Sequence, residues 1–478
     1  MPKVSIREID TTGGEQLEFL NYTVVIPGPV LADSKGNKLA AGLITKAELN
    51  TFSAKVGKVD TAGEVDGFLS DTDASNFLKQ DLDFIMIKEL LNRGLTIYYV
   101  PAYGWKVDAN PNYSFADNLE RLTIFEQAEW PDNEGEVSSN PFKILKIHDR
   151  GFCDVRFITL GGLNQIEDKV TFEIQKCALE CAGDRGDAVA LLDVPTIAED
   201  DERKLDNADI IDEWINGGLP AVQADDLPAC GDFSGIASTK IIREGISWTD
   251  RESESYGRYG TIFSPHFVSD FNKENAFPTS FDYLACFARY INKFKDWFAM
   301  SGSVRGVSPF ANLTPTIQFG DSDVNILQKR TDTQEGHIAT NVICNIRPYG
   351  NVIWGNRTMH PLSKPNNGDP NVAIQLTASS FLNIRHLCID IKKTLYRAAR
   401  RFAFEPNSDE LWFSFKGAIT PLLDEMKANQ GIRGYQVFKV KTNKKALFVA
   451  RIKIIPVEAV EDFDLTVELA YSIEVTEE

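Results

Sequence analysis

The chain has no long apolar run and a shortage of positive charge. Its 478 residues are 43% hydrophobic, but its apolar stretches are far shorter than the ~20 residues that a membrane-spanning helix needs. We therefore expect no membrane insertion. The formal net charge is −19, which argues against nucleic acid as the partner of the whole chain. Residues Met1–Glu8 have neither an apolar core nor a small-residue cleavage site, so we do not expect a secretory signal.

Signatures of catalysis are also absent. The sequence lacks the motifs GxxxxGK[ST], HExxH, GxGxxG and GxSxG. Gly302–Gly306 resembles a nucleophile elbow, but its serine comes one position early, so we predict a turn. The five histidines are dispersed, and His386 is expected to be exposed within a basic helix. We predict no enzyme activity and no cofactor. An α/β hydrolase-like enzyme built on the central region is the alternative of another class.

The cysteines and the acidic runs do not suggest a metal site. The seven cysteines are scattered and odd in number, which suits free thiols in a reducing compartment. Cys177 and Cys181 are four residues apart on a predicted helix, a spacing that could hold a metal. No second pair lies nearby in the sequence, so buried core thiols are the preferred interpretation. The run Glu199–Glu202 lacks the glycine and spaced ligands of a calcium loop, and we interpret it as solvated.

The positive charge that is present lies near the end of the chain. From Asn341 to Glu478 there are 18 Lys and Arg against 15 Asp and Glu, whereas the preceding residues carry 32 against 54. The first part is therefore strongly acidic and the last part slightly basic. A basic patch on such a protein indicates one defined acidic partner surface.

The first two thirds of the sequence predict a mixed α/β fold. Buried-type strands alternate with helices, a pattern typical of a partly parallel sheet covered by helices. The predicted elements are a strand Tyr22–Ile26 that ends at Pro27, a helix over 76–92, and strands over 95–100, 154–160 and 188–193. Further helices are predicted over 171–182, around 210–215 and over 281–298. Residues 197–256 are polar and acidic, and we interpret them as surface connections.

Both ends of the chain contain short alternating segments. Val4, Ile6 and Ile9 predict a strand before a flexible Gly13-Gly14 joint. Near the other end, apolar residues alternate with polar ones at Leu465, Val467, Leu469, Tyr471, Ile473 and Val475. At ~3.4 Å per residue this second segment can extend about 40 Å, twice a typical strand. Two interpretations stay open: the ends complete the sheet of their own domain, or they pair with a strand outside it.

Residues 381–402 predict an amphipathic helix with a basic side. Its apolar stripe has helical spacing at Phe381, Ile384, Leu387, Ile391, Leu395, Ala398 and Phe402. The cations off the stripe are Arg385, Lys392, Lys393, Arg397, Arg400 and Arg401. Further positive residues that could extend this surface are Lys416, Lys427, Arg433, Lys439, Lys441, Lys444 and Lys445. The side is either an ordinary solvated face or a docking face for an acidic partner.

Several sequence blocks, taken in order, resemble contractile bacteriophage tail sheath proteins. The blocks are Gly183–Asp193, Phe263–His266, Phe277–Ser280, Tyr349–Thr358, Phe404–Asn407, Gly431–Tyr435 and Ile455–Ala459. The resemblance implies a multidomain protomer with an inner domain from residues 21–100 and 341–464. It also implies a central outer α/β domain over 101–340, with variable surface insertions. Arms that exchange strands with neighbouring subunits would occupy residues 1–20 and 465–478.

The same resemblance implies a structural function. The protein would polymerise as stacked hexameric rings around a tail tube and contract to drive the tube through a bacterial envelope. Its other partners would be baseplate and tail terminator proteins, and it would lie in the virion tail after assembly in the host cytoplasm. The basic residues from Arg385 to Arg433 are the tube-facing candidates. The sheath of a contractile bacteriocin or injection system is the nearest alternative.

Overall fold

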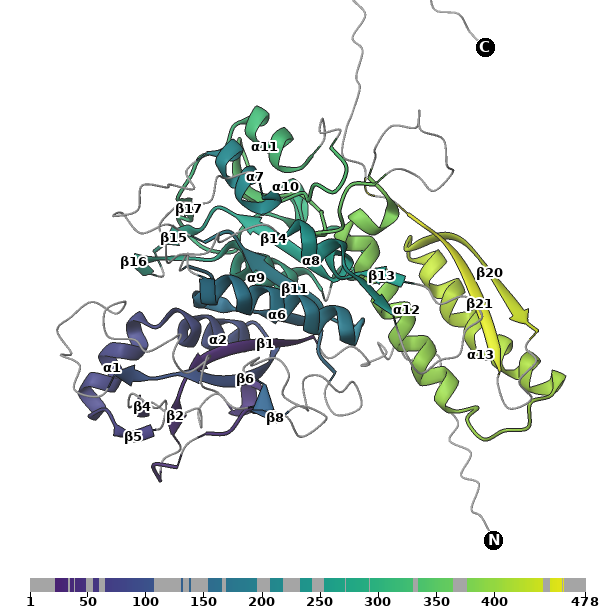
Figure 1. Cartoon of the computed structure of the whole chain (residues 1–478), viewed down its shortest axis with the longest axis horizontal. Coiled ribbons are helices and arrows are strands. Elements are labelled where there is room, and N and C mark those ends of the chain that lie inside the picture. The colour runs from purple at the N-terminus through teal and green to yellow at the C-terminus, as the bar shows by residue number, and fades with distance from the viewer. Residues whose placement is uncertain are drawn as a thin grey trace, which may run out of the picture.

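The computed structural model describes residues 22–32, 35–37, 39–48, 55–59, 65–106, 130–131, 137–138, 154–165, 169–195, 207–217, 233–242, 253–270, 272–291, 293–329, 334–363, 376–441, 448–457 and 459. These residues form a large body, from Tyr22 to Ser363, and a smaller C-terminal module, from Leu382 to Pro456. The module projects from one side of the body (Figure 1). Among the described helices, none is long and apolar enough to cross a bilayer.

An eight-stranded sheet forms the centre of the body. Six neighbouring strands are parallel: β18 (Asn341–Ile346), β14 (Gly260–Ser264), β11 (Val189–Asp193), β10 (Phe157–Thr159), β1 (Thr23–Pro29) and β6 (Thr96–Tyr103). Antiparallel strands close the two edges, β19 (Gly350–Trp354) beside β18 and β3 (Gly42–Ile44) beside β6. The mixed α/β fold class is thus confirmed.

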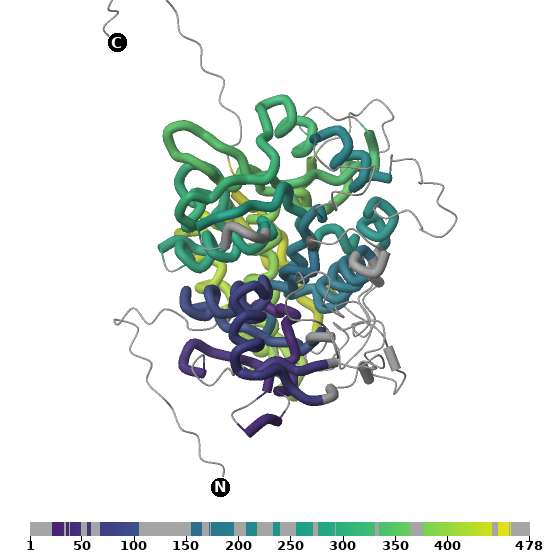
Figure 2. Tube along the Cα trace, turned by 90° about the vertical axis from the view of Figure 1, so that its left-hand side faces the viewer, coloured from purple at the N-terminus to yellow at the C-terminus, as the bar shows by residue number. Residues whose placement is uncertain are grey.

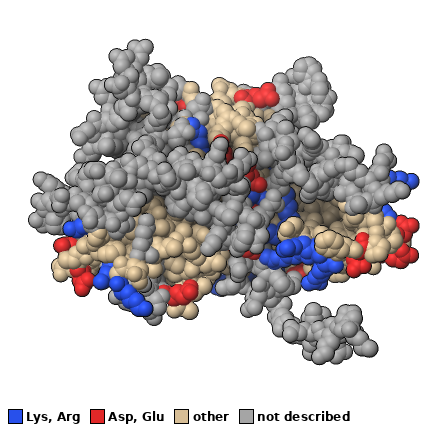
Figure 3. Space-filling model, turned by 60° about the horizontal axis from the view of Figure 1, so that its bottom comes forward, with Lys and Arg blue, Asp and Glu red and all other residues tan. Residues whose placement is uncertain are grey.

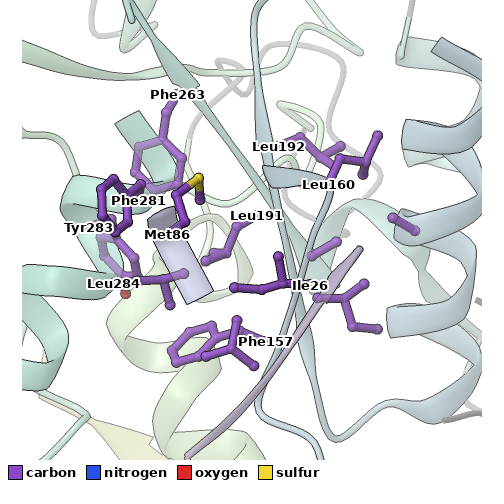
Figure 4. Close-up of a cluster of buried hydrophobic side chains, with 14 of the residues drawn as sticks. Ile26, Met86, Phe157, Leu160, Leu191, Leu192, Phe263, Phe281, Tyr283 and Leu284 are labelled. Carbon is purple, nitrogen blue, oxygen red and sulfur yellow. The ribbon is translucent and has the colours of Figure 1, made fainter. Parts of the chain in front are cut away.

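Helices cover both faces of this sheet, which explains why its central strands are mostly apolar and fully buried. Helices α2 (Leu82–Asn92) and α9 (Thr279–Tyr290) pack on one face, and α6 (Lys169–Arg185) packs on the other. Figure 4 shows Leu191 and Leu192 of β11 pointing to opposite sides, each into an apolar layer. Every residue of β11 is buried, as expected for a parallel sheet covered twice.

The remaining elements are short and surround the sheet. One small sheet contains β2 (Leu31–Ala32), β4 (Lys55–Val59) and β5 (Val65–Phe68), and β7 (Trp105–Lys106) pairs with β4. Two further sheets are pairs, of β8 (Trp130–Pro131) with β9 (Val137–Ser138) and of β12 (Lys240–Ile242) with β13 (Ser253–Ser255). The last has three strands, β15 (Phe267–Ser269) between β16 (Asn272–Phe277) and β17 (Thr314–Pro315). The other helices of the body are α1 (Asp71–Gln80), α7 (Ala208–Asn216), α8 (Ser234–Ser238), α10 (Gly302–Arg305) and α11 (Asp321–Leu327). Short 3₁₀ helices are η1 (Lys46–Glu48), η3 (Gly161–Gln165), η4 (Tyr256–Tyr259) and η5 (Ala378–Ser380).

Most predicted elements are confirmed, and four differ. The helix over 76–92 is two helices, because the Asp81 side chain accepts a hydrogen bond from Phe84 N and starts α2. The helix over 281–298 ends at Tyr290. Gly302–Arg305 forms the one-turn helix α10 instead of a turn. Strand β1 continues through Pro27 to Pro29, because beyond Val25 it pairs with β6 on one side only, so a missing N–H is tolerated.

The sheet crosses the expected domain boundaries near residues 100 and 340. Strands β1 and β6, from the range 21–100, lie beside β10, β11 and β14, which come from the range 101–340. Strands β18 and β19, after residue 340, belong to the same sheet. Figure 2 shows the N-terminal elements at one end of the body and the segments around residues 300–350 at the other. The expected arms, residues 1–20 and 465–478, lie outside the described residues.

A candidate interaction surface on the C-terminal module

Helix α12 (Leu382–Arg400) connects the body to the C-terminal module. The amphipathic helix predicted over 381–402 is confirmed, and its apolar stripe is buried at Ile384, Leu387, Ile391 and Ala398. The first half of α12 packs on the body, and the second half packs on α13 (Asp409–Ala428) and a hairpin of β20 (Ile432–Val440) and β21 (Val449–Pro456). The basic side of α12 therefore lies beside the body along its first half and beside the module along its second half.

A buried ionic junction holds the first half of α12 to the body. Arg156, just before β10, places Nη1 at 2.7 Å from Asp390 Oδ1 of α12 and Nη2 at 2.5 Å from Asp296 Oδ2, beyond the end of α9. Nη2 also lies 3.0 Å from His386 Nδ1, while His386 Nε2 lies 3.0 Å from the Tyr283 hydroxyl. Because a guanidinium only donates, His386 Nδ1 accepts and its Nε2 carries the proton.

Burial sets the ionisation of this junction. It holds the pKa of His386 well below its usual value, and the nearby charges of Arg156 and Arg385 lower it further. Burial raises the pKa of Asp390, and Arg156 opposes that effect. Burial alone would lower the pKa of Arg156, but Asp390 and Asp296 together raise it above the ordinary value. The prediction of an exposed His386 is wrong, because the ring packs against Phe157 inside the junction.

Three of the predicted tube-facing cations point into the protein instead of toward solvent. Arg385 is 5% exposed and its guanidinium lies over the Tyr259 ring. Lys393 is 8% exposed and donates to Asp154 Oδ1 at 2.5 Å and to the Val155 carbonyl. Lys392 is half-buried and donates to the Tyr259 hydroxyl at 2.7 Å. Sequence spacing placed these residues off the apolar stripe, but the body covers that side of the helix as well.

Arg397 lies at the boundary between the part of α12 beside the body and the part beside the module. Its Nη2 is 2.9 Å from Asp154 Oδ2, the carboxylate that also accepts from Lys393, and its side chain is partly exposed. Beyond it, Arg400 and Arg401 are exposed at the far end of α12. Figure 3 shows Lys and Arg gathered along this helix on the underside of the molecule. The exposed basic face of α12 is therefore confined to its last turns.

A tryptophan from the body closes the core of the module. Trp297 packs with Leu387 and Ile391 of α12 and with Leu423 and Ile432 of the module. Its Nε1 donates to the Asn429 carbonyl at 3.1 Å. Gly431 lies close beside it, and a Cβ there would be 3.1 Å from the indole ring, tighter than an ordinary van der Waals contact. These contacts fix the module against the body at a second place.

The turn between α12 and α13 is held by aromatic packing and a helix cap. Phe402 packs edge-to-face on Phe415 of α13, with ring centroids 5.9 Å apart. The Ser408 hydroxyl accepts from Leu411 N and caps α13. Asp409, in the first turn of α13, pairs with Lys439 of β20 at 2.7 Å, so the turn is also tied to the hairpin.

The β20–β21 hairpin has one covered face and two open edges. Its inner residues Tyr435, Val437, Ile452 and Ile454 pack toward α12 and α13. On the outer face, Gln436 pairs with Lys453 and Phe438 with Arg451. The two strands contain four cations and no acidic residue. Within the described part of the chain, β20 and β21 pair only with each other, so each keeps a free row of backbone donors and acceptors.

The exposed candidates that remain are spread over three elements. Arg400 and Arg401 lie at the end of α12, Lys416 and Lys427 on α13, and Arg433 at the bulged start of β20. Lys441 is exposed after β20, and Lys439 is occupied by Asp409, while Lys444 and Lys445 are outside the described residues. The exposed residues of the basic surface predicted from the sequence therefore come from three elements of the module, not from α12 alone.

Sequence reasoning missed Arg156, Asp296 and Phe404. Arg156 is a cation directly before the apolar run of β10, which is a weak signal. Its burial cannot be predicted from the sequence, because its carboxylate partners Asp296 and Asp390 are distant in the chain. Asp296 lies next to Trp297 and Phe298, and nothing in that aromatic context indicates a buried ion pair. Phe404 was quoted within a motif without a role, although the structure exposes it completely.

The described residues show no arrangement for metal binding. Within them, no group of three or more His, Cys, Asp and Glu side chains could hold an ion. Cys177 and Cys181 lie on α6, and burial raises the pKa of Cys181 to about 12, which favours its protonated form.

Comparisons with known proteins place this surface in a family context. The family described as "Phage tail sheath C-terminal domain" matches residues 377–470, which include the whole module. No curated protein matches the chain in sequence.

Solved structures match the chain along nearly its full length. One is the sheath complex of an extracellular contractile injection system, PVC, in the contracted state, with 14% identity, 98% coverage of both chains and a TM-score of 0.54. Two others come from the anti-feeding prophage. Its contracted baseplate matches with 15% identity, covers 98% of this chain and 99% of that chain, and has a TM-score of 0.55. Its contracted helical sheath matches with 12% identity, 98% coverage of both chains and a TM-score of 0.51. The chain therefore has the fold of the contractile sheath proteins, and its residues 377–470 match the phage tail sheath C-terminal domain.

Proposed function

We propose that this chain is the subunit of a contractile sheath. It polymerises as stacked hexameric rings around a tail tube, in a metastable extended state, and then contracts to drive the tube through a bacterial envelope. The observation that carries this proposal is the open hairpin of the C-terminal module, within the segment that matches the sheath family. A two-stranded sheet with two free edges is incomplete by itself and fits strands from other subunits.

The arms of neighbouring subunits would complete this sheet. The alternating segments at Val4–Ile9 and Leu469–Val475 are the donors, as the resemblance to sheaths implies. Net hydrogen bonds stabilise by ~0.5–1.5 kcal/mol each, so a strand that makes about five contributes several kcal/mol per junction. Such junctions keep rings linked while subunits slide and rotate.

The exposed cations of the module would dock on the tube. Arg400 and Arg401 extend beyond the body at the end of α12, where an acidic tube surface can approach them. Exposed ion pairs contribute only about 0–1 kcal/mol each, and salt screens them over ~10 Å. This face would therefore hold the tube in register and still release it during contraction.

The proposed sheath function fits two types of particle, a phage virion and a contractile injection system. The matching family is that of phage sheaths, which favours genome delivery from a virion, with baseplate and tail terminator proteins as further partners. The fold neighbours come from PVC and anti-feeding prophage particles, which favours a contractile injection system. Nucleic acid inside purified particles would identify a phage, and its absence would identify the alternative.

Negative-stain microscopy of the purified chain tests the proposal. A sheath subunit forms rings or long tubes, whereas an α/β hydrolase-like enzyme remains a small oligomer. A single small species at all protein and salt concentrations, with or without tail tubes, would refute the sheath function.

A further inference from the structure

One aromatic residue in the turn between α12 and α13 is fully exposed. Phe404 has 106% relative exposure, the largest among the described apolar side chains of its size. Its backbone has φ 71°, a left-handed conformation that residues other than Gly and Asn rarely adopt. Strained backbone and exposed apolar surface each oppose stability of the isolated protomer, and strain of this kind concentrates at functional sites.

The rest of the turn explains how Phe404 is held outward. Its near neighbour Phe402 points inward onto Phe415, and Phe402 N donates to the Ala399 carbonyl at 3.0 Å. On the other side, Glu405 N donates to the Phe402 carbonyl at 3.3 Å. The inward ring and these two hydrogen bonds fix the chain on both sides of Phe404, so its ring is presented from a defined position.

The end of α12, which precedes Phe404 in the chain, combines aromatic surface with positive charge. Tyr396 is 56% exposed on the last turns of α12, and the Arg400 guanidinium lies 5.5 Å from the centroid of its ring. Arg401 is exposed at the helix end. In the part of the chain that the structure describes, neither Arg400 nor Arg401 forms an ion pair. Aromatic and arginine side chains of this kind are the usual centres of protein–protein binding energy.

We propose that Phe404 is the anchor of the docking face, inserting its ring into an apolar socket on an acidic partner while Arg400 and Arg401 meet carboxylates around that socket. The partner follows from the proposed function, on which this inference rests: it is the acidic surface of the tail tube. Burial of the ring on the tube offsets the strain that the free protomer holds. The arginines guide the approach, and the ring sets how tightly the docked state is held.

The variant Phe404→Gly tests this directly. Glycine accepts the left-handed backbone without strain and removes the ring. The expected result is a protomer with a melting temperature equal to or above that of the wild type and with at least tenfold weaker binding to preassembled tail tubes of the same particle, measured by cosedimentation. Wild-type tube binding by Phe404→Gly would overturn the inference, as would a loss of folding stability, which would show that the ring has a structural role.

Two control variants sharpen the result. Phe404→Trp keeps a large ring and should bind tubes within about threefold of the wild type. Tyr349→Ala removes an aromatic residue of the body that is 53% exposed, and it should leave tube binding unchanged. Equal loss in Tyr349→Ala and Phe404→Gly would contradict a specific anchor.

The outcomes also separate this inference from the proposed function. If the wild type neither polymerises nor binds tubes, the sheath function fails. If the wild type binds tubes and Phe404→Gly binds equally well, only the anchor fails. If Phe404→Gly binds tubes normally but no longer self-assembles without them, the ring contacts a second copy of the chain, and the choice of the tube is overturned.

Discussion

The body and the C-terminal module differ in how they pair their backbone hydrogen-bonding groups and in how far they bury their charged side chains. The body has a parallel sheet with helices on both faces, and it buries polar groups such as Arg156, Asp193 and Asp282 completely. The module has a hairpin with one covered face, open edges and several exposed aromatic residues. The core of the body includes Leu382 and Ile389 of α12, whereas the described hairpin keeps its outer face and its edges uncovered. Under the proposed function, the body supplies most of the stability and the module supplies surface for assembly.

The largest effect should come from removing a strand donor. Replacing residues 1–10 with a Gly/Ser segment of equal length should abolish rings and tubes in negative-stain images, because each junction loses several backbone hydrogen bonds at ~0.5–1.5 kcal/mol each. Circular dichroism and the melting temperature should match the wild type, because the role proposed for this segment lies outside its own protomer. Normal tubes from this variant would remove the N-terminal arm from assembly and weaken the contrast between the two regions.

The second effect tests the junction between the regions. Arg156→Met leaves Asp296 and Asp390 buried without their cation, which should lower the free energy of unfolding by ~3–5 kcal/mol in urea titrations. The matched control is Lys295→Met, since Lys295 and Glu425 bridge the same two regions with side chains 46% exposed; its cost should be ~0–1 kcal/mol. Similar costs for both variants would show that the buried junction does not hold the module.

The third prediction concerns how pH changes the effect of one buried carboxyl of the body, Asp282, on folding stability. Burial raises the pKa of Asp282 to about 7, against the lowering effect of the Ser308 hydrogen bond. Between pH ~4 and 7 the unfolded carboxyl is ionised while the folded one keeps its proton, so this group destabilises the wild type by roughly 1.4 kcal/mol per pH unit over that range. The advantage of Asp282→Asn over the wild type should therefore grow from pH 4 to 7 and level off above 7.

Thermal unfolding of both proteins across this pH range measures that advantage. In the module, the hydrogen bond from Lys439 lowers the pKa of Asp409 and the hydrogen bond from Ser408 lowers the pKa of Glu410, so these two exposed groups contribute pH dependence of the opposite sign. A constant difference between Asp282→Asn and the wild type at all pH values would contradict the buried, protonated carboxyl.

The smallest effect should come from exposed charge. Reversing Arg400 and Arg401 together, as Arg400→Glu/Arg401→Glu, should weaken tube binding about tenfold at low salt, with less difference at ~1 M salt, where screening acts within ~3 Å. Tube-free self-assembly should persist. The double variant Lys79→Glu/Lys88→Glu, which reverses two exposed lysines of the body, is the matched control. If it weakens tube binding equally, net charge and not the α12 end governs docking.

The sequence predicts the body well because its signals are local. The apolar runs of β6, β10 and β11 and the spacing of α6 follow from periodicity, and the covered parallel sheet follows from their alternation. The break at Asp81 could not be predicted, because an aspartate in this apolar pattern fits the interior of one helix as well as the cap between two helices. The sheet crosses the predicted domain boundaries because pairing between β14 and β18 joins residues that are far apart in sequence.

The interaction surface is less predictable for the same reason. Spacing on α12 separates apolar from charged residues, but it does not show that the body also covers Arg385 and Lys393. Their burial depends on Tyr259 and Asp154, which come from distant segments. Phe404 shows the opposite case, in which an apolar residue is exposed because its neighbour Phe402 takes the inward place.

The attachment of α12 at Arg156 has a mechanical consequence. Helix α12 carries Asp390 of the buried ion pairs, and its second half packs on the module, so a force applied at the hairpin reaches the body through this helix as well as through Trp297. The helix meets the sheet next to β10, an interior strand with a parallel neighbour on each side. A load that enters there is shared with strands on both sides, whereas a strand at the rim of the sheet has only one neighbour.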